Sequence, residues 1–355
     1  KYRMHLQQRI NAFVKLGDFL SQFSNEVIQK KETIEHNELF FEGFKHQLKL
    51  AEENNGWFSK ENMAFAIKGC AQSLTSKNLN KWLSAYSIPE RDAKQVAIIM
   101  AGNIPLVGFH DFLSVLISGH HALIKQSSND KHLLPYLAKY LEYVEPEFKG
   151  VIHFTDKKLE SFDAVIATGS NNTARYFEYY FKDRPSIIRN NRNSVAVLNG
   201  KENLEDMQAL SEDIFRYYGL GCRNVSKLYV PKNYNFDLFF QGIYHWHPII
   251  EKAKYANNYD YNKAVYIMSE FDMLENGFLM IKEDVSAVSP IATVFYEYYD
   301  NSTQLKAKLE QEKESIQCIV SNGFIKNEIA FGMTQKPQLW DYADDVDSIE
   351  FLLEI

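Results

Sequence analysis

One cysteine in this chain has the surroundings that nucleophilic chemistry needs. Cys222 follows Gly219 and Gly221, and glycines beside a thiol let the backbone approach a substrate and leave its amides available for an oxyanion. Ahead of Cys222, apolar residues recur at helical spacing over 204–218, and the run at 226–230 is typical of a strand. The pattern predicts a thiol on a helix-to-strand turn. The simpler alternative is a small buried hydrophobic residue, the usual role of a lone cysteine.

Polar and small residues also follow several predicted strands. The apolar run at 95–100 leads into Asn103, and the run at 121–125 ends in Lys125. Further candidates after strand ends are Ser127, Ser128, Thr168, Gly169 and Ser170. Helices predicted at 109–118, 133–144 and 173–181 alternate with these strands, which indicates a doubly wound parallel sheet. Ligands bind at the carboxyl ends of such strands, so we expect these side chains to share one crevice.

The rest of the chain gives weaker patterns. Residues 1 to about 60 have the periodicity of amphipathic helices. The later half is mixed, with strands predicted at 263–268, 292–296 and 317–321 and a charged helix at 305–313.

Composition narrows the class of protein. The chain has 355 residues, of which 45% are hydrophobic and 24% charged, as in ordinary globular proteins. Its net charge of −7 argues against non-specific nucleic-acid binding. Three cysteines spread far apart argue against a disulfide framework and favour a reducing compartment. No apolar run approaches the length of a membrane span, and the first residues lack a signal-peptide core, so we expect a cytoplasmic protein.

Two histidines are the main candidates for metal ligands. His245 and His247 flank Trp246, but their neighbours supply no carboxylate or thiolate partner. Loop or core histidines are therefore the favoured interpretation, and we expect no metal site.

The order of these motifs resembles a known superfamily. Asn103-Ile104-Pro105-Leu106, the strand ending at Lys125, the Thr168-Gly169-Ser170 segment, a polar turn feeding a strand, and the glycines before Cys222 are similar to aldehyde dehydrogenases. More narrowly, they resemble the LuxC-type acyl-CoA reductases, which form fatty aldehydes. The resemblance covers about residues 95–325.

The resemblance implies a role for each matching residue. Cys222 matches the nucleophile, and Asn103 matches the amide that forms the oxyanion hole with the Cys222 backbone. The residues implied in cofactor binding are Lys125, Ser127 and Ser128 near the ribose, and Thr168, Gly169 and Ser170 near the pyrophosphate. Ser128 stands where many NAD-using relatives carry a glutamate that would repel a 2′-phosphate. The expected cofactor is therefore NADPH.

The sequence also departs from the superfamily pattern. The general-base glutamate of hydrolytic aldehyde dehydrogenases falls on Ile188 or Arg189, neither of which can take a proton from water. Its absence suits an enzyme that must not hydrolyse an activated acyl group. A displaced turn with Glu178 or Glu212 as the base is the alternative. Residues 285–290 replace a second glutamate-containing segment of the superfamily.

The expected fold is α/β and aldehyde-dehydrogenase-like. It has N-terminal helices with a doubly wound, Rossmann-type NADP-binding domain at 1–187, an α/β catalytic domain carrying Cys222 at 188–325, and a C-terminal segment at 326–355.

The expected function is NADPH-dependent reduction of a fatty acyl-CoA or other acyl thioester to the aldehyde through S-acyl-Cys222. The sequence does not identify the proton donor, for which His245 and His247 are candidates. The alternatives are a non-catalytic acyl-carrying or partner subunit with the same fold, and a metal-dependent hydrolase using those two histidines. A homo-oligomer, or an association with an acyl-transferring partner subunit, is compatible with either enzymatic or carrier function.

Overall fold

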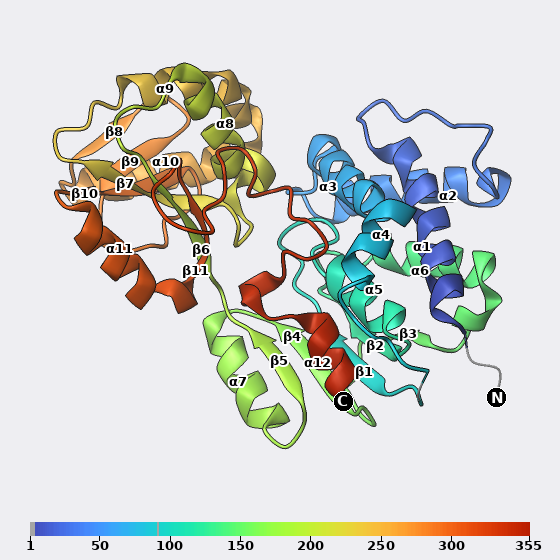
Figure 1. The fold of residues 1–355 in the computed structure, drawn as a ribbon. Helices are drawn as coiled ribbons and strands as arrows, with labels where there is room; N and C mark the ends of the chain where they lie inside the picture. The colour runs from blue at the N-terminus through green and yellow to red at the C-terminus, as the bar shows by residue number, and fades with distance from the viewer. Residues whose placement is uncertain (1–3, 91) are drawn as a thin grey trace. The chain divides into compact units, whose positions relative to one another are not determined.

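Two structural units make up the chain in the computed structural model, which describes residues 4–90 and 92–355 (Figure 1). Unit 1 contains the described residues up to Asn190 together with Gln338–Ile355. Unit 2 is the continuous segment Asn191–Pro337. Each unit has its own sheet.

The sheet of unit 1 has five strands in the order β3-β2-β1-β4-β5, all paired in parallel. The strands are β1 Gln95–Ile99, β2 His121–Lys125, β3 Ile152–Phe154, β4 Ala164–Thr168 and β5 Ser186–Arg189. The chain adds β2 and β3 on one side of β1 and then continues with β4 and β5 on the other. This reversal leaves a switch point between the carboxyl ends of β1 and β4, where open α/β sheets bind ligands. The doubly wound sheet predicted from the sequence is confirmed.

Helices pack with this sheet in unit 1 and contribute most of the buried apolar residues of the unit. They are α1 Leu6–Leu20, α2 Asn37–Asn54, α3 Lys60–Ser73, α4 Ser76–Leu83, α5 Phe109–Ile117, α6 Leu133–Val144, α7 Asn171–Phe181 and α12 Ser348–Glu354, with 3-10 turns η1 Ser21–Phe23, η2 Pro146–Phe148 and η6 Ala343–Asp345. The apolar face of α1 is fully buried through Phe13, Leu16 and Phe19, as its spacing predicts. Turns separate α1 from α2, so the helical pattern of the first 60 residues is interrupted.

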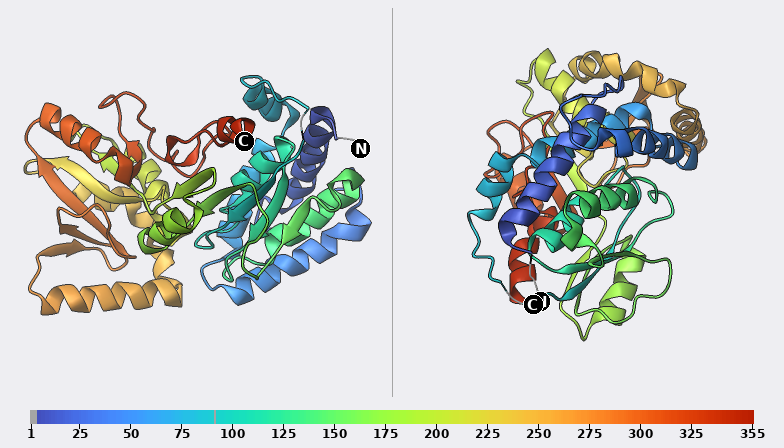
Figure 2. Two further views of the ribbon diagram at one scale, coloured as in Figure 1. Left: turned by 90° about the horizontal axis from the view of Figure 1, so that it is seen from below. Right: turned by 90° about the vertical axis from the view of Figure 1, so that its right-hand side faces the viewer.

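The end of the chain returns to unit 1. Trp82 Nε1 donates to Tyr342 Oη at 2.6 Å, and the His120 ring bonds to the Leu352 carbonyl at 2.8 Å. Helix α12, red in Figure 1 and Figure 2, packs against α5. Residues 338–355 therefore complete a unit that began before residue 191.

Unit 2 has a six-stranded sheet in the order β11-β6-β7-β10-β9-β8. Its strands are β6 Asn193–Val197, β7 Val225–Pro231, β8 Met273–Glu275, β9 Met280–Glu283, β10 Thr293–Tyr299 and β11 Ile316–Val320. All pairs are parallel except β8 with β9. Its helices are α8 Leu204–Phe215, α9 Asp237–Ile243, α10 Ala253–Met268 and α11 Ser302–Gln311, with 3-10 turns η3 Arg216–Gly219, η4 Tyr244–Glu251 and η5 Lys313–Ser315.

The strand predicted at 263–268 is wrong, because these residues form the last turns of α10. This gold helix is continuous in both views of Figure 2. It buries Tyr255, Tyr259 and Tyr266, whose spacing follows one helical face, and leaves Ile267 and Met268 exposed. The burial of these tyrosines on one helical face therefore decides the secondary structure of this segment, and its short apolar run does not make it a strand. Across the described ranges, no helix combines the length and the apolar character needed to cross a bilayer.

Candidate active site

Cys222 lies on the turn between α8 and β7, as predicted, and its side chain is exposed. After α8, Tyr217, Tyr218 and Gly219 adopt left-handed backbone conformations with φ of 56°, 58° and 76°. Left-handed conformations are unfavourable for tyrosine and are found mainly where the surrounding structure enforces them, often at functional sites. The strained segment reverses the chain so that Gly221 and Cys222 precede β7 on an exposed turn.

Asn224 holds this turn in place. Its side-chain oxygen accepts from the Gly221 amide at 2.8 Å, and its Nδ2 lies within hydrogen-bond distance of the carbonyls of Asp213, Ile214 and Arg216 at 3.1, 3.3 and 2.8 Å. These carbonyls belong to the end of α8, which otherwise has no intrahelical donors for them. Asn224 therefore caps the carboxyl end of α8 and also fixes the backbone beside the Cys222 thiol.

Ser194 of β6 adds a second contact, since its Oγ donates to the Cys222 carbonyl at 3.0 Å. Sequence reasoning missed both Asn224 and Ser194. An asparagine between a cysteine and a strand was the available signal for the first, because asparagine often bonds backbone groups at turns. The sequence held no signal for the second, which depends on the pairing of β6 with β7.

The other two cysteines have different surroundings. Burial raises the pKa of the Cys70 thiol to about 12, which disfavours the thiolate. Cys318 is buried on β11, with the Arg223 guanidinium 3.5 Å from its sulfur. All three cysteines lie in described ranges, and none is in a disulfide. Of the three, Cys222 is the exposed one.

The loop after β1 carries Asn103 on the surface. Leu106 in this loop has a left-handed φ of 56°, and its amide donates to Asp130 Oδ2 at 2.8 Å. Burial raises the pKa of Asp130 to about 6, against the opposing effect of that hydrogen bond. Asp130 lies on the loop after β2, so one buried carboxylate joins the loop of Asn103 to the loop of the predicted ribose contacts.

The two loops also touch directly. A Cβ built on Gly102 would lie 2.5 Å from Ser127 Oγ, so glycine is needed for this approach. Lys125, at the end of β2, donates to the Lys157 carbonyl at 3.3 Å. Ser128 is exposed, and its carbonyl accepts from Asn54 Nδ2 at 3.0 Å. The end of α2 therefore helps to shape this loop.

The segment after β4 leads into the amino terminus of α7. Ser170 caps the helix, accepting from the Thr173 amide at 3.3 Å. The Gly169 amide donates to the Arg189 carbonyl at 3.2 Å, and a Cβ on Gly169 would lie 3.0 Å from Phe177 and Thr173. Helix amino termini favour bound phosphate.

Register places the candidate ends of β2 and β4 level with each other on either side of β1. Ile99 of β1 lies opposite both Lys125 and Ala167. A lysine, hydroxyls and a helix amino terminus therefore lie along the carboxyl edge of the sheet around the switch point, and these groups fit a dinucleotide cofactor.

The position expected for a general base contains an ion pair. Arg189 Nη1 donates to Asp111 Oδ2 at 2.5 Å, and both side chains are buried. Of the alternative bases, Glu212 is paired with Arg216 at 2.8 Å, and Glu178 is exposed on α7. Asp111 thus forms an ion pair with Arg189 inside unit 1.

The predicted site residues are divided between the units. Asn103, Lys125, Ser127, Ser128, Thr168, Gly169 and Ser170 belong to unit 1, whereas Cys222 belongs to unit 2. Unit 1 gathers its members at the carboxyl edge of one sheet. The joint action of Asn103 and Cys222 stays a prediction.

His245 and His247 have structural contacts. The His245 ring lies 3.0 Å from the Gly242 carbonyl and 3.3 Å from Ser211 Oγ, and His247 stacks on Tyr244. Within residues 4–90 and 92–355, no group of three or more His, Cys, Asp or Glu side chains is arranged to hold a metal ion.

The fold is that of aldehyde dehydrogenases. An indole-3-acetaldehyde dehydrogenase of P. syringae, in complex with NAD+ and IAA, aligns with a TM-score of 0.64 at 12% identity, covering 90% of this chain and 72% of that one. Aldehyde dehydrogenase 21 of Physcomitrella patens, in complex with succinate, gives 0.63 at 10% identity, covering 99% and 89%. An NAD+ complex of an aldehyde dehydrogenase from Bacillus cereus gives 0.61 at 14% identity, covering 90% and 71%.

The sequence places the chain in one particular family within this fold. The sequence matches the acyl-CoA reductase (LuxC) family over residues 21–238, more than half of the chain, and the protein belongs to that family. A comparison with curated proteins found no match. Family and fold together indicate an oxidoreductase of acyl or aldehyde groups.

Proposed function

We propose that the protein reduces an acyl-CoA, with a fatty acyl chain, to the aldehyde at the expense of NADPH, through an S-acyl intermediate on Cys222. The observation that carries this proposal is the exposed Cys222 on a turn fixed by Asn224, in a member of the acyl-CoA reductase family. Family membership supports the thioester, and the turn supports a covalent step.

The first half of the reaction is acyl transfer. The Cys222 thiolate attacks the thioester carbonyl, the new C–S bond forms, and the bond to CoA breaks with CoA leaving as a thiolate that takes up a proton. The Cys222 backbone amide, together with the Asn103 side-chain amide, would stabilise the oxyanion. The acyl group then stays on Cys222.

The second half needs a cofactor, for which Lys125, Ser127 and Ser128 would hold the ribose and residues 168–170 the pyrophosphate. When bound, the nicotinamide supplies the hydride that converts the acyl group to the oxidation level of an aldehyde. Ser128 is uncharged and lies near Lys125 in sequence, so the side chain at position 128 does not repel a 2′-phosphate. This supports NADPH over NADH.

Hydrolysis would waste the acyl group before reduction. In the proposed enzyme, Ile188 and Arg189 replace the base that would activate water, and the Arg189 ion pair with Asp111 keeps this guanidinium engaged. The unreduced S-acyl enzyme should therefore survive for many turnover times. The reaction needs acyl-CoA and NADPH in a reducing compartment, which supports a cytoplasmic location.

The decisive experiment is a panel of acyl-CoA substrates of increasing chain length assayed with NADPH and with NADH, combined with mass spectrometry of the protein incubated without cofactor. We expect NADPH oxidation, aldehyde formation and one acyl group on Cys222. Cys222→Ala should abolish both adduct and turnover, whereas Cys70→Ser and Cys318→Ser should retain them.

The other outcomes separate the alternatives. An adduct on Cys222 without cofactor oxidation would indicate an acyl-carrying subunit. An adduct on Cys70 or Cys318 would contradict the assignment of the nucleophile. Steady release of free acid would show that a base is present after all.

A further inference from the structure

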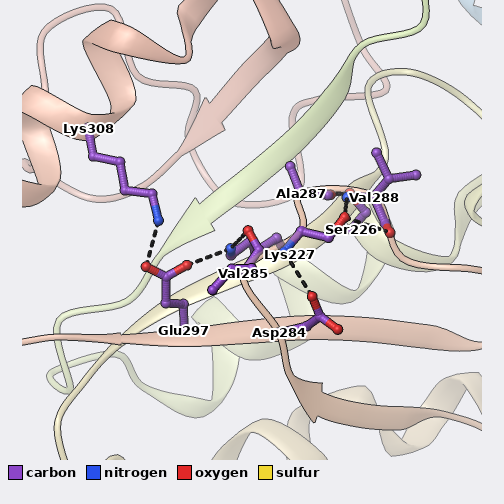
Figure 3. A network of polar contacts seen from close by, with 9 residues as sticks. Ser226, Lys227, Asp284, Val285, Ala287, Val288, Glu297 and Lys308 are labelled. Carbon is purple, nitrogen blue, oxygen red and sulfur yellow. Dashed lines mark hydrogen bonds and ion pairs between the residues drawn. The ribbon is translucent and has the colours of Figure 1, made fainter.

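A fully buried lysine holds the loop that follows β9. Lys227 lies on β7, five residues after Cys222, and none of its side chain is exposed. Its Nζ donates to the Val285 carbonyl at 2.7 Å (Figure 3). The neighbouring Ser226 Oγ donates to the Ala287 carbonyl at 2.7 Å. Two consecutive residues of β7, the strand that follows the Cys222 turn, therefore hold one loop.

This loop, residues 284–292, connects two parallel neighbouring strands. Because β9 and β10 run in the same direction, the chain must return along the sheet to begin β10. The connection contains no helix. Its path therefore depends on side-chain bonds to its carbonyls, and Lys227 and Ser226 supply two of them.

The charge of Lys227 is balanced inside the same unit. Glu297 Oε2 lies 2.7 Å from Lys227 Nζ, and Glu297 Oε1 lies 2.6 Å from Lys308 Nζ (Figure 3). Burial lowers the pKa of Lys227, and the bond to Glu297 opposes this effect. Burying an ammonium group is costly unless it is paired, so placing a lysine here needs both Glu297 and the Val285 carbonyl.

Further hydrogen bonds hold the start of the loop, one of them to Lys282 of β9. Asp284 accepts from Lys282 Nζ at 2.5 Å and from the Ser286 amide at 2.9 Å, and Ser286 Oγ accepts from the Val288 amide at 3.2 Å. Asp284 and Val288 are both drawn in Figure 3. Val285 and Val288 are nevertheless 82% and 60% exposed. The loop is thus held through its backbone and not through a buried apolar core.

The far end of the loop and the turn that carries the thiol line the same cavity. A cavity of about 50 Å³ is lined by Tyr218, Gly219 and Asn224 of the turn, by Ser226, and by residues 289–292 of the loop. Movement of the loop would therefore change one wall of a cavity that the Cys222 turn also lines.

We propose that Lys227 and Ser226 are positioning residues for Cys222, acting through the loop 284–292. Lys227 does not touch the thiol. It fixes the loop, and the loop in turn acts on the turn 219–224 through the cavity that both segments line. The kinetic part of this inference rests on the proposed acyl transfer to Cys222.

The test compares Lys227→Met with Lys308→Met. Each substitution removes one of the two ammonium partners of Glu297 and leaves the other. Because Lys227 is fully buried and Lys308 is partly exposed, chemical denaturation first establishes that both variants are fully folded under the assay conditions. Only Lys227→Met removes the bond to the Val285 carbonyl. We expect S-acylation of Cys222 to slow at least tenfold in Lys227→Met and less than twofold in Lys308→Met, with most of the rate restored in Lys227→Arg. Ser226→Ala should give an intermediate loss.

Amide hydrogen exchange gives a measurement that needs no substrate. Exchange should accelerate within residues 284–292 and 219–224 in Lys227→Met and remain unchanged there in Lys308→Met. Equal acylation by the two methionine variants, or unchanged exchange at 219–224 in Lys227→Met, would overturn the proposal. If the unmodified protein forms no adduct on Cys222, the proposed function fails, and the exchange data alone decide the positioning role.

Discussion

The loop of Asn103 in unit 1 and the turn of Cys222 in unit 2 are fixed by different chemistry. The Asn103 loop depends on Asp130, an ionisable group with one hydrogen bond from the Leu106 amide. The Cys222 turn depends on Asn224, whose neutral side-chain amide accepts from the Gly221 amide and has three backbone carbonyls within hydrogen-bond distance of its nitrogen. An amide both donates and accepts at any pH, whereas a carboxylate only accepts and changes its charge. The bond that holds the Asn103 loop should therefore respond to pH, whereas the bonds made by the Asn224 side chain should not, although Asp213 at the end of α8 is itself ionisable, with its pKa raised to about 6 by burial.

The largest effect is expected from a substitution that gives the Cys222 turn an ionisable group in place of the Asn224 amide. Asn224→Asp retains an acceptor for the Gly221 amide but sets a carboxylate against three carbonyl oxygens. We expect a loss of about 4 kcal/mol in the free energy of unfolding at pH 8. Burial and the carbonyls should raise the pKa of the new carboxyl, so its protonation should recover about half of that loss near pH 5. Chemical denaturation at the two pH values measures this change.

Asn224→Ala should have the next largest effect. It leaves the carbonyls at the end of α8 without their donor and releases the Gly221 amide. We expect a loss of about 3 kcal/mol in stability and a fall of about a hundredfold in the rate of S-acylation of Cys222. A stopped-flow measurement of CoA release reports the rate. A rate within threefold of the unmodified protein would show that the turn holds its shape without Asn224.

Asp130→Asn tests the other side of the comparison. The pKa of Asp130 is about 6 in the folded protein and lower in the unfolded chain, so its protonation stabilises the fold below about pH 4, and this contribution is lost as pH rises through 6. Relative to the asparagine variant, the unmodified protein should lose about 2 kcal/mol between pH 4 and pH 8. Parallel stability curves for the two proteins would contradict the assignment.

The smallest expected effect concerns Ser128 on the same loop. Ser128→Glu places a carboxylate where a 2′-phosphate is expected, and such a contact costs on the order of 1–2 kcal/mol. The ratio of kcat/KM with NADPH to that with NADH should fall about tenfold. S-acylation of Cys222 in the absence of cofactor should stay unchanged, which separates the cofactor loop from the thiol turn. An unchanged ratio would place the adenosine ribose elsewhere.

The sequence predicted the strands of unit 1 well because buried parallel strands appear as short continuous apolar runs, such as 95–99. The same rule failed at 263–268, where the deciding interactions are those of Tyr255 and Tyr259, outside the apolar run. For the site, the glycines beside Cys222 indicated the turn. The contacts of Lys227 and Asp130 were not predictable, since Lys227 meets Glu297 and Asp130 meets Leu106 only after the sheets have formed.

The return of residues 338–355 to unit 1 has a consequence for how the protein is synthesised. Unit 2 is continuous, so all of it has been translated before the partners of Trp82 and His120 are made. Domains generally fold as units during synthesis, the earlier before the later. Here the segment translated first is completed last. The apolar surface of α5 that α12 covers must therefore stay exposed, and vulnerable to aggregation, while the whole of unit 2 is translated.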